Sequence, residues 1–305
     1  MVWGSAWAGL ARWRPRRVRV VWMLARWVAL AGLVAGCASV GAGCECLDVP
    51  LEEGESGGGG QEEEGGGEDE GGGPVEDDGG GKAKKPDLKR LSKRGNQQVG
   101  SFESAKRKVY EIFESNPKDF YCGCDYADKE IDFESCGYKV RKSKTRAART
   151  EVEHVVPASV FGKKFPAWTE GHADCDGKGR TCVSQVEMVY QYMEADLYNL
   201  RPAVGEVNAD RSDKPMGEIP GEEREYGECD FEATSDLAEP RPEVRGDVAR
   251  TYFYMDWAYP GFGIMDASQR KLMEKWAKAD PPDKKERAWA KQVEEVQGNH
   301  NPFLD

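Results

Sequence analysis

A carboxylate and an imidazole stand side by side at one point of this 305-residue chain, in Glu153 and His154. They lie in a run rich in β-branched residues, 151–156, which precedes Pro157 and predicts a short strand. Neighbouring side chains in a strand point to opposite faces, but at a strand end both can address one cleft. Such a pair could combine a general base active near neutral pH with an oxygen ligand for a hard cation.

A second group of polar residues follows in the segment 193–211, MEADLYNLRPAVGEVNADR. Asn199 comes just after a helical pattern, and Asn208 and Asp210 come shortly after Asn199. Carboxylate and amide oxygens are hard ligands that suit Mg²⁺ or Ca²⁺. The two groups are therefore compatible with a cation bound beside a base, although a structural or exposed role for the Glu–His pair fits the residue types at least as well.

Several other hydrolase patterns are missing from the sequence. It contains three histidines and no HExxH segment, no GxSxG elbow, and no Gly-rich phosphate loop after a strand. These absences disfavour a zinc protease, a serine hydrolase and a nucleotide-binding protein of the P-loop type.

The residues around these groups predict a helix-rich α+β domain that begins near Val99. Ser101 is typical of a helix N-cap, and apolar residues follow it at helical spacing until Pro117 ends the pattern. Further helical patterns, separated by turns rich in Pro and Gly, cover 185–197, 247–257, 267–278 and 283–296. A weaker strand pattern covers 138–140.

Charge is distributed unevenly along the chain, whose net charge is −12 and mean hydropathy −0.72. This hydropathy excludes a polytopic membrane protein. Residues 38–81 contain fourteen acidic and no basic side chains, whereas residues 82–305 contain forty-one acidic and thirty-seven basic ones. The acidic total therefore reflects one short segment and does not exclude a nucleic-acid partner for the remainder.

The N-terminal segment has the pattern of an export signal. The basic stretch RWRPRRVR precedes an apolar run at 27–36 that is much shorter than a membrane-spanning helix. The run ends in LVAG before Cys37, which resembles a bacterial lipobox. We expect a lipoprotein signal peptide over 1–36, lipidation of Cys37, and a location at the outer membrane or cell surface of a bacterium. An ordinary signal peptide with an incidental cysteine, or a short anchor, is the alternative.

Residues 37–97 are predicted to be a disordered tether. The Gly and Glu/Asp repeats within it contain almost no apolar side chains, so nothing offsets the entropy of ordering them. The tether ends in the Lys-rich piece KAKKPDLKRLSKR, which is compatible with contact to anionic lipid or nucleic acid and equally with a solvated linker. The folded domain is assigned to 98–305.

Six of the nine cysteines lie in the predicted domain: Cys122, Cys124, Cys136, Cys175, Cys182 and Cys229. An even number behind an export signal favours disulfides. Cys175 and Cys182 close a short loop and are the first pair expected. A metal cluster that includes Cys122 and Cys124 is the alternative, although the paired CxxC spacing of a zinc site is missing.

Five segments, taken in order, resemble the bacterial endonuclease I family of secreted, non-specific nucleases, which belongs to the His-Me finger or ββα-metal group. They are FYCGCD, SCGYKVRKSKTRAARTEVEHVVPA, NLRPAVGEVNADR, ARTYFYM and VQGNHNP. The resemblance covers about 101–303, nearly the whole predicted domain. It implies a ββα-metal motif at the centre of the fold and the hydrolysis of phosphodiester bonds in DNA and RNA, with little sequence preference and 5′-phosphate products.

The resemblance also implies roles for individual residues. His154 would be the general base, while Glu153 and Asn199 would bind one divalent cation, most simply Mg²⁺, with Ca²⁺ or Mn²⁺ as alternatives. Arg180 would contact the phosphate. The loop at 163–182 is longer than is usual in the family, so two other arginines are alternatives for that role: Arg201 and Arg211. The remaining polar residues, Asn208 and Asp210, would support the site, and the enzyme would act as a monomer.

A basic run at 139–150 leads directly into the Glu–His pair and contains six basic and no acidic side chains. Because this basic run lies next to the Glu–His motif, it predicts contacts to the phosphates of the nucleic-acid backbone. The residues proposed for these contacts are Lys142, Lys144, Arg146 and Arg149. A solvated surface is the alternative for the run, and a surface lipoprotein that captures DNA without cutting it is the alternative for the whole protein.

Overall fold

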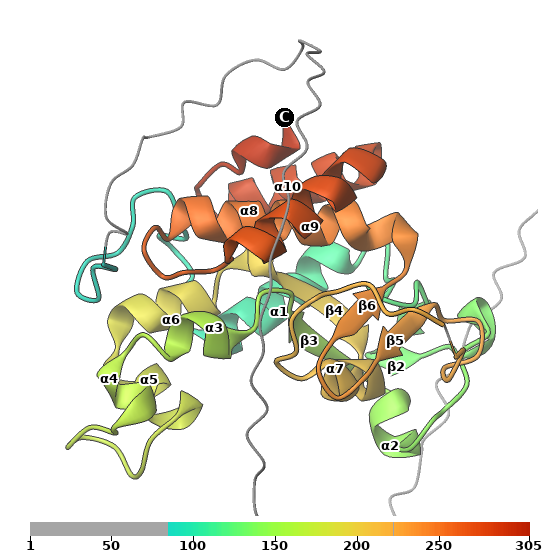
Figure 1. Ribbon diagram of the computed structural model, residues 1–305, viewed down its shortest axis with the longest axis horizontal. Coiled ribbons are helices and arrows are strands. Elements are labelled where there is room, and N and C mark those ends of the chain that lie inside the picture. The colour runs from blue at the N-terminus through green and yellow to red at the C-terminus, as the bar shows by residue number, and fades with distance from the viewer. Residues whose placement is uncertain (1–84, 222) are drawn as a thin grey trace, which may run out of the picture. The chain divides into compact units, whose positions relative to one another are not determined.

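The computed structural model describes residues 85–221 and 223–305, which belong to the unit Gly73–Asp305 (Figure 1). The predicted signal peptide, Cys37 and most of the predicted tether lie outside the described residues. The longer helices are α1 (Phe102–Phe113), α8 (Arg245–Ala258), α9 (Ala267–Ala279) and α10 (Lys284–Gln297). No helix in the described part of the chain is long and apolar enough to cross a membrane. The mixture of helices and small sheets agrees with the predicted α+β class.

The centre of the domain is an antiparallel hairpin of two five-residue strands. β3 (Thr150–His154) pairs with β4 (Leu200–Val204), and His154 lies opposite Leu200. The helix α7 (Gly205–Arg211) follows β4 without a loop. Strand β3 was predicted from its β-branched residues, whereas β4 was not, because Pro202 argues against a strand. The two-stranded sheet tolerates this proline at its edge.

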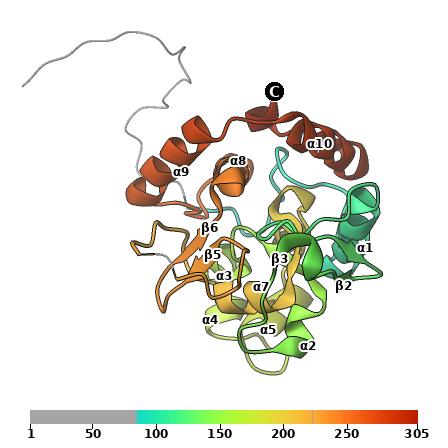
Figure 2. The same cartoon turned by 90° about the vertical axis from the view of Figure 1, so that its right-hand side faces the viewer.

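Helices surround this hairpin. In Figures 1 and 2, α8, α9 and α10 lie together on one side of it. α8 and α9 pack against each other, and α8 is buried on most of its surface. The smaller helices on other sides are α2 (Lys144–Ala147), α3 (Ala158–Gly162), α4 (Pro166–Thr169), α5 (Arg180–Val186) and α6 (Met188–Glu194). The hairpin therefore belongs to a core that it could not build alone.

Side-chain caps fix the ends of several predicted helices. The Ser101 hydroxyl accepts a hydrogen bond from the backbone N–H of Ser104 at the start of α1. Asp266 and Asp283 cap α9 and α10 in the same way. The bounds of α8, α9 and α10 confirm the predicted ones within two residues at each end. Helix α1 begins directly after Ser101 as predicted and ends at Phe113, before the predicted limit at Pro117.

Two predicted elements differ from the structure. The helix expected over 185–197 is divided into α5, α6 and the 3₁₀ helix η2 (Leu197–Asn199), because Glu187 adopts an extended conformation between α5 and α6. The strand expected over 138–140 forms only an isolated bridge between Tyr138 and Gly227. The spacing of apolar residues in the sequence did not reveal this break, because the residues of α5 and α6 each have helical spacing.

Two short hairpins complete the sheets. β1 (Tyr126–Ala127) pairs with β2 (Glu130–Ile131), and β5 (Phe231–Ala233) pairs with β6 (Ala238–Pro240). Both pairs are antiparallel and neither joins the central hairpin.

The folded domain begins before the boundary predicted at residue 98. Leu91 packs against the core, and Asn96 is fully buried. The Asn96 side-chain amide donates a hydrogen bond to the carbonyl oxygen of Tyr192 at 3.0 Å. Leu91 and Asn96 therefore pack with the folded domain, since both find partners that are distant in sequence.

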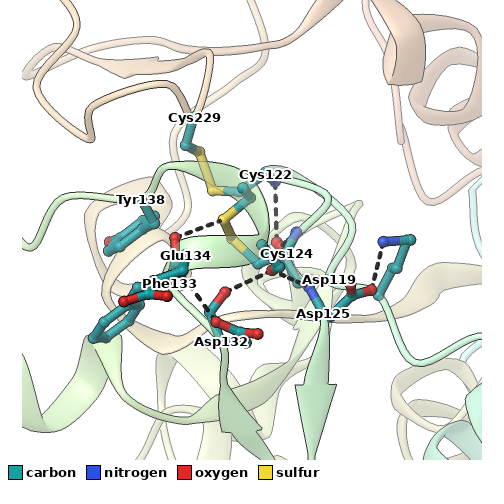
Figure 3. Close-up of a disulfide and its surroundings, with 12 residues drawn as sticks. Asp119, Cys122, Cys124, Asp125, Asp132, Phe133, Glu134, Tyr138 and Cys229 are labelled. Atoms are coloured by element: carbon teal, nitrogen blue, oxygen red, sulfur yellow. Dashed lines mark hydrogen bonds and ion pairs between the residues drawn. A yellow bond between two sulfur atoms is a disulfide. The ribbon is translucent and has the colours of Figure 1, made fainter.

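All six cysteines of the domain form disulfides, with the pairs Cys122–Cys229, Cys124–Cys136 and Cys175–Cys182. The last pair confirms the one expected first from the sequence. Figure 3 shows Cys122 and Cys124 close to the carboxylate of Asp119. Because both cysteines are oxidised to disulfides, neither supplies the thiolate that the alternative metal cluster would need.

We expect the longest of these cross-links to contribute most to stability. Cys122 and Cys229 are 107 residues apart, so the variant Cys122→Ser/Cys229→Ser should lose about 4–5 kcal/mol of unfolding free energy. The variant Cys175→Ser/Cys182→Ser opens a loop of only 7 residues and should lose roughly half as much. Urea denaturation measures both losses, and equal values would contradict an entropic origin.

Candidate active site

A cavity of about 360 Å³ opens where the end of β3 meets α7, α3 and the start of α5. Its polar lining includes Arg146, Glu153, His154, Arg180, Asn208 and Arg211. Segments that are up to 67 residues apart in sequence thus converge on one space, from Arg146 to Asp213, and the Glu–His pair lines it.

His154 is buried and held in one orientation. Its Nε2 atom lies 2.8 Å from the carbonyl oxygen of Glu194. A carbonyl can only accept, so Nε2 carries the proton and Nδ1 keeps its lone pair. Burial, and then the positive charge of Arg180, lowers the pKa of His154 to about 3. The ring is therefore neutral at physiological pH, and Phe102 packs against it with ring centroids 4.8 Å apart.

Glu153 is a buried carboxylate on the same strand end. The Tyr121 hydroxyl donates to its Oε1 at 2.9 Å, and Nη1 of Arg211 lies 3.1 Å from the same oxygen. Burial raises the pKa of Glu153, while the charge of Arg211 and the Tyr121 hydrogen bond oppose that shift. Both contacts are made to Oε1, and the carboxylate still lines the cavity.

Arg211, the last residue of α7, ties that helix to the end of β3. Only 1% of its surface is exposed. Its guanidinium donates to the carbonyl oxygens of His154, at 2.8 Å, and Val155. Together with the ion pair to Glu153, these bonds fix both the backbone and the carboxylate of the strand end. Arg211 is therefore a buried positioning residue and has little freedom to meet a substrate phosphate.

The two asparagines of the second cluster have different environments. Asn199 is fully buried, and both ends of its side-chain amide are bonded to the backbone of Val156. Its Oδ1 accepts from the Val156 N–H at 2.7 Å and its Nδ2 donates to the Val156 carbonyl at 2.9 Å. Asn199 does not line the cavity, whereas Asn208 does. Of the two asparagines, Asn208 and not Asn199 therefore shares the cavity with Glu153.

Glu151 organises the wall of the cavity next to Asn208. Its carboxylate accepts from Nδ2 of Asn208 at 3.0 Å and binds the guanidinium groups of Arg146 and Arg149. Burial alone would raise the pKa of Glu151, but these hydrogen bonds outweigh it and lower the pKa. Gly205 is required nearby, since a Cβ there would lie 2.6 Å from the carbonyl oxygen of Arg146.

Arg180 lines the cavity as predicted and is half-exposed. Its Nε donates to the carboxylate of Glu194 at 2.6 Å, and its guanidinium lies 5.0 Å from the centre of the Phe102 ring. Arg201, an alternative for the same role, is buried elsewhere and stacks 3.2 Å from the centre of the Trp289 ring. Glu194 therefore positions both Arg180, through its carboxylate, and His154, through its carbonyl.

The other predicted residues lie around or away from the cavity. Of the four predicted backbone contacts, Arg146 lines the cavity, Arg149 binds Glu151, and Lys142 and Lys144 are exposed without lining it. Asp210 bonds Arg141 and Tyr226, so it anchors the basic run and does not reach the cavity.

Three positioning residues were not assigned from the sequence: Tyr121, Glu151 and Glu194. Tyr121 lies within the FYCGCD motif, and Glu194 lies within the second polar cluster, so weak signals existed. Their partners are 32 and 40 residues away in the chain, which sequence spacing does not reveal.

The sequence as a whole matches one family. A family model described as Endonuclease I covers residues 90–305. The chain belongs to the endonuclease I family. It is 38% identical over 218 residues to a periplasmic deoxyribonuclease of Aeromonas hydrophila, a match that spans 68% of this chain and 87% of the relative. An extracellular deoxyribonuclease of the same organism is 38% identical over 216 residues, which span 68% of this chain and 89% of the relative.

A third relative is Endonuclease-1 of Buchnera aphidicola. It is 37% identical over 212 residues, which span 68% of this chain and 81% of the relative. The protein is therefore an endonuclease, and the family resemblance drawn from the sequence motifs is confirmed.

The endonuclease should depend on Arg211 for stability. Arg211→Ala leaves the Glu153 carboxylate and two backbone carbonyls without their buried partner, so we expect a loss of about 3–5 kcal/mol of unfolding free energy. Arg180→Ala removes a half-exposed guanidinium and should cost less than about 1 kcal/mol. Urea denaturation of both variants checks this, and a similar small loss for Arg211→Ala would contradict its positioning role.

Proposed function

We propose that this endonuclease hydrolyses phosphodiester bonds of DNA and RNA with one divalent cation and leaves 5′-phosphate ends. The observation that carries the proposal is the neutral His154 ring in the same cavity as Glu153, Asn208 and Arg180. Nδ1 of this ring forms no hydrogen bond with any residue that the structure describes. The hairpin β3–β4 followed by α7 supports this assignment, since two strands and a helix are the elements expected for a ββα-metal motif.

The donor set of the cavity fits a hard cation such as Mg²⁺, with Ca²⁺ or Mn²⁺ as alternatives. Glu153 brings a carboxylate. Asn208 brings its Oδ1, which accepts no hydrogen bond within the described part of the chain, while Glu151 holds its Nδ2. We therefore assign Glu153 and Asn208 as the residues that would hold the cation, and give Asn199 a structural role. A cation there would stabilise the negative charge that develops on the phosphate and the leaving 3′ oxygen.

The protein's own side chains would carry the remaining steps. His154 Nδ1 would take a proton from a water molecule as that water attacks the phosphorus. The hydrogen bond from Nε2 to the Glu194 carbonyl would stabilise the charge that the ring then acquires. Arg180, held by Glu194 through Nε, would donate its remaining N–H groups to a phosphate oxygen.

DNA is the first substrate proposed, because two relatives are named deoxyribonucleases. RNA follows as a second substrate, since recognition through backbone phosphates does not require a particular sugar or base. The same relatives are named periplasmic and extracellular, which supports export of this chain. We further propose that the chain is anchored through a lipid on Cys37 and that the catalytic domain acts as a monomer.

A plasmid-nicking assay tests this function. Full-length protein should cut supercoiled DNA with Mg²⁺ and should stop cutting when EDTA is added. His154→Ala should reduce the rate by at least about a hundredfold, the usual contribution of a positioned general base. Mass spectrometry of the ends should find 5′-phosphates. Undiminished cutting by His154→Ala would overturn the mechanism, and DNA binding without cutting under any divalent ion would support the capture alternative.

The two asparagines can be separated by a pair of variants. Asn208→Ala should weaken Mg²⁺ activation, seen as a higher Mg²⁺ concentration at half-maximal rate, with little change in stability. Asn199→Ala leaves the buried Val156 N–H and carbonyl unpaired and should cost about 2–4 kcal/mol of unfolding free energy. A stable Asn199→Ala variant with weakened Mg²⁺ activation would instead restore the ligand role first expected for Asn199.

A further inference from the structure

A second groove continues the active-site cavity along α1. It encloses about 590 Å³ between one side of α1 and the outer edge of β3. The two spaces share Arg146, Val152, Arg180 and Asn208 in their linings. The second space therefore adjoins the active-site cavity, and we call it the α1 groove.

The α1 groove is lined by five cationic side chains, of which two form no ion pair within the described part of the chain. Glu103 binds Lys106 at 2.6 Å, and Glu151 binds Arg146, so both carboxylates of the groove are neutralised. The guanidinium of Arg180 is bound by Glu194, as described above. The two remaining cations are Arg107 and Lys129, which are exposed and form no ion pair with any other described residue.

Lys129 has a left-handed backbone conformation, which is uncommon for a lysine. Asp128 and Lys129 form the turn between β1 and β2 with φ values of 52° and 69°, a left-handed conformation in which Asn and Gly are preferred. The Lys129 carbonyl accepts a hydrogen bond from the N–H of Thr150 at 2.8 Å, and its ammonium lies 4.5 Å from the centre of the Tyr110 ring. This hydrogen bond fixes the turn to the start of β3, and the Lys129 ammonium group lines the groove.

We propose that the α1 groove binds backbone phosphates of the nucleotides that flank the scissile bond, with Arg107 and Lys129 as the main phosphate contacts. The inference rests on the proposed nuclease function and deepens it, because it defines the substrate as a chain of several nucleotides. Unpaired cations along a groove provide the sequence-independent attraction that nucleic-acid backbones need. The strand would leave the active site over α1.

The test compares the variant Arg107→Ala/Lys129→Gly with a control of equal charge change, Lys271→Ala/Lys278→Ala. The control lysines are exposed on α9 and form no described ion pair. Glycine suits the left-handed conformation at position 129, so the melting temperature of the groove variant should stay equal or rise. A loss of binding therefore cannot come from unfolding.

Two substrates separate binding from chemistry. With long DNA, the groove variant should show a KM raised on the order of tenfold and a salt-dependence slope smaller by about 1.8, while kcat stays unchanged. With bis(4-nitrophenyl) phosphate, which is small enough to occupy the active-site cavity alone, the groove variant and wild type should hydrolyse at equal rates. The control should match wild type with both substrates.

Anisotropy of a labelled oligonucleotide in EDTA measures affinity without catalysis. The groove variant should bind on the order of tenfold more weakly than wild type at low salt. If wild type cuts nothing but this difference persists, the proposed function fails while the groove assignment stands. Equal affinity and equal KM for the groove variant and wild type, or equal losses in the groove variant and the control, would overturn the assignment.

Discussion

A single buried guanidinium, that of Arg211, determines the geometry at the end of β3. It binds the Glu153 carboxylate and the carbonyl oxygens of His154 and Val155. A buried ion pair adds little net stability compared with apolar packing, yet removing one partner is expensive. Arg211 therefore fixes the arrangement of the site, and it joins α7 to β3 at the point where both reach the cavity.

The strands of the central hairpin are short, and side chains extend their pairing. Beyond the end of β3, the Val155 N–H donates to the backbone carbonyl of Asn199 at 3.0 Å, and the Asn199 amide then pairs with both polar backbone groups of Val156. The side-chain amide of Asn199 thus acts as an additional peptide group of the sheet. This pairing fixes the backbone next to His154.

Acidic side chains near the cavity form ion pairs with arginines and orient them. Glu194 forms an ion pair with Arg180, and Glu151 forms ion pairs with Arg146 and Arg149. The negative charges of these two carboxylates are therefore balanced by guanidinium groups. The net charge of −12 is for this reason a poor guide to the partner of the domain. Fourteen of the acids belong to residues 38–81, and several others are internal partners of arginines.

The sequence by itself determined the elements with strong local signals. The capped helices α1, α9 and α10, the β-branched strand β3 and the Cys175–Cys182 disulfide depend on neighbours in the chain, and all were predicted. The family motifs likewise identified Glu153, His154 and Arg180, three residues that line one cavity.

Only the tertiary structure decided which polar residues share the site. It placed Asn208 and not Asn199 at the cavity, paired β4 with β3 despite Pro202, and brought Tyr121 and Glu194 to the Glu–His pair. Asn199 and Asn208 are chemically identical and only nine residues apart, so residue type could not distinguish them. The two differ because they lie on different elements. Asn199 is in η2, and its side-chain amide bonds to the backbone of Val156, whereas Asn208 is in α7 and lines the cavity.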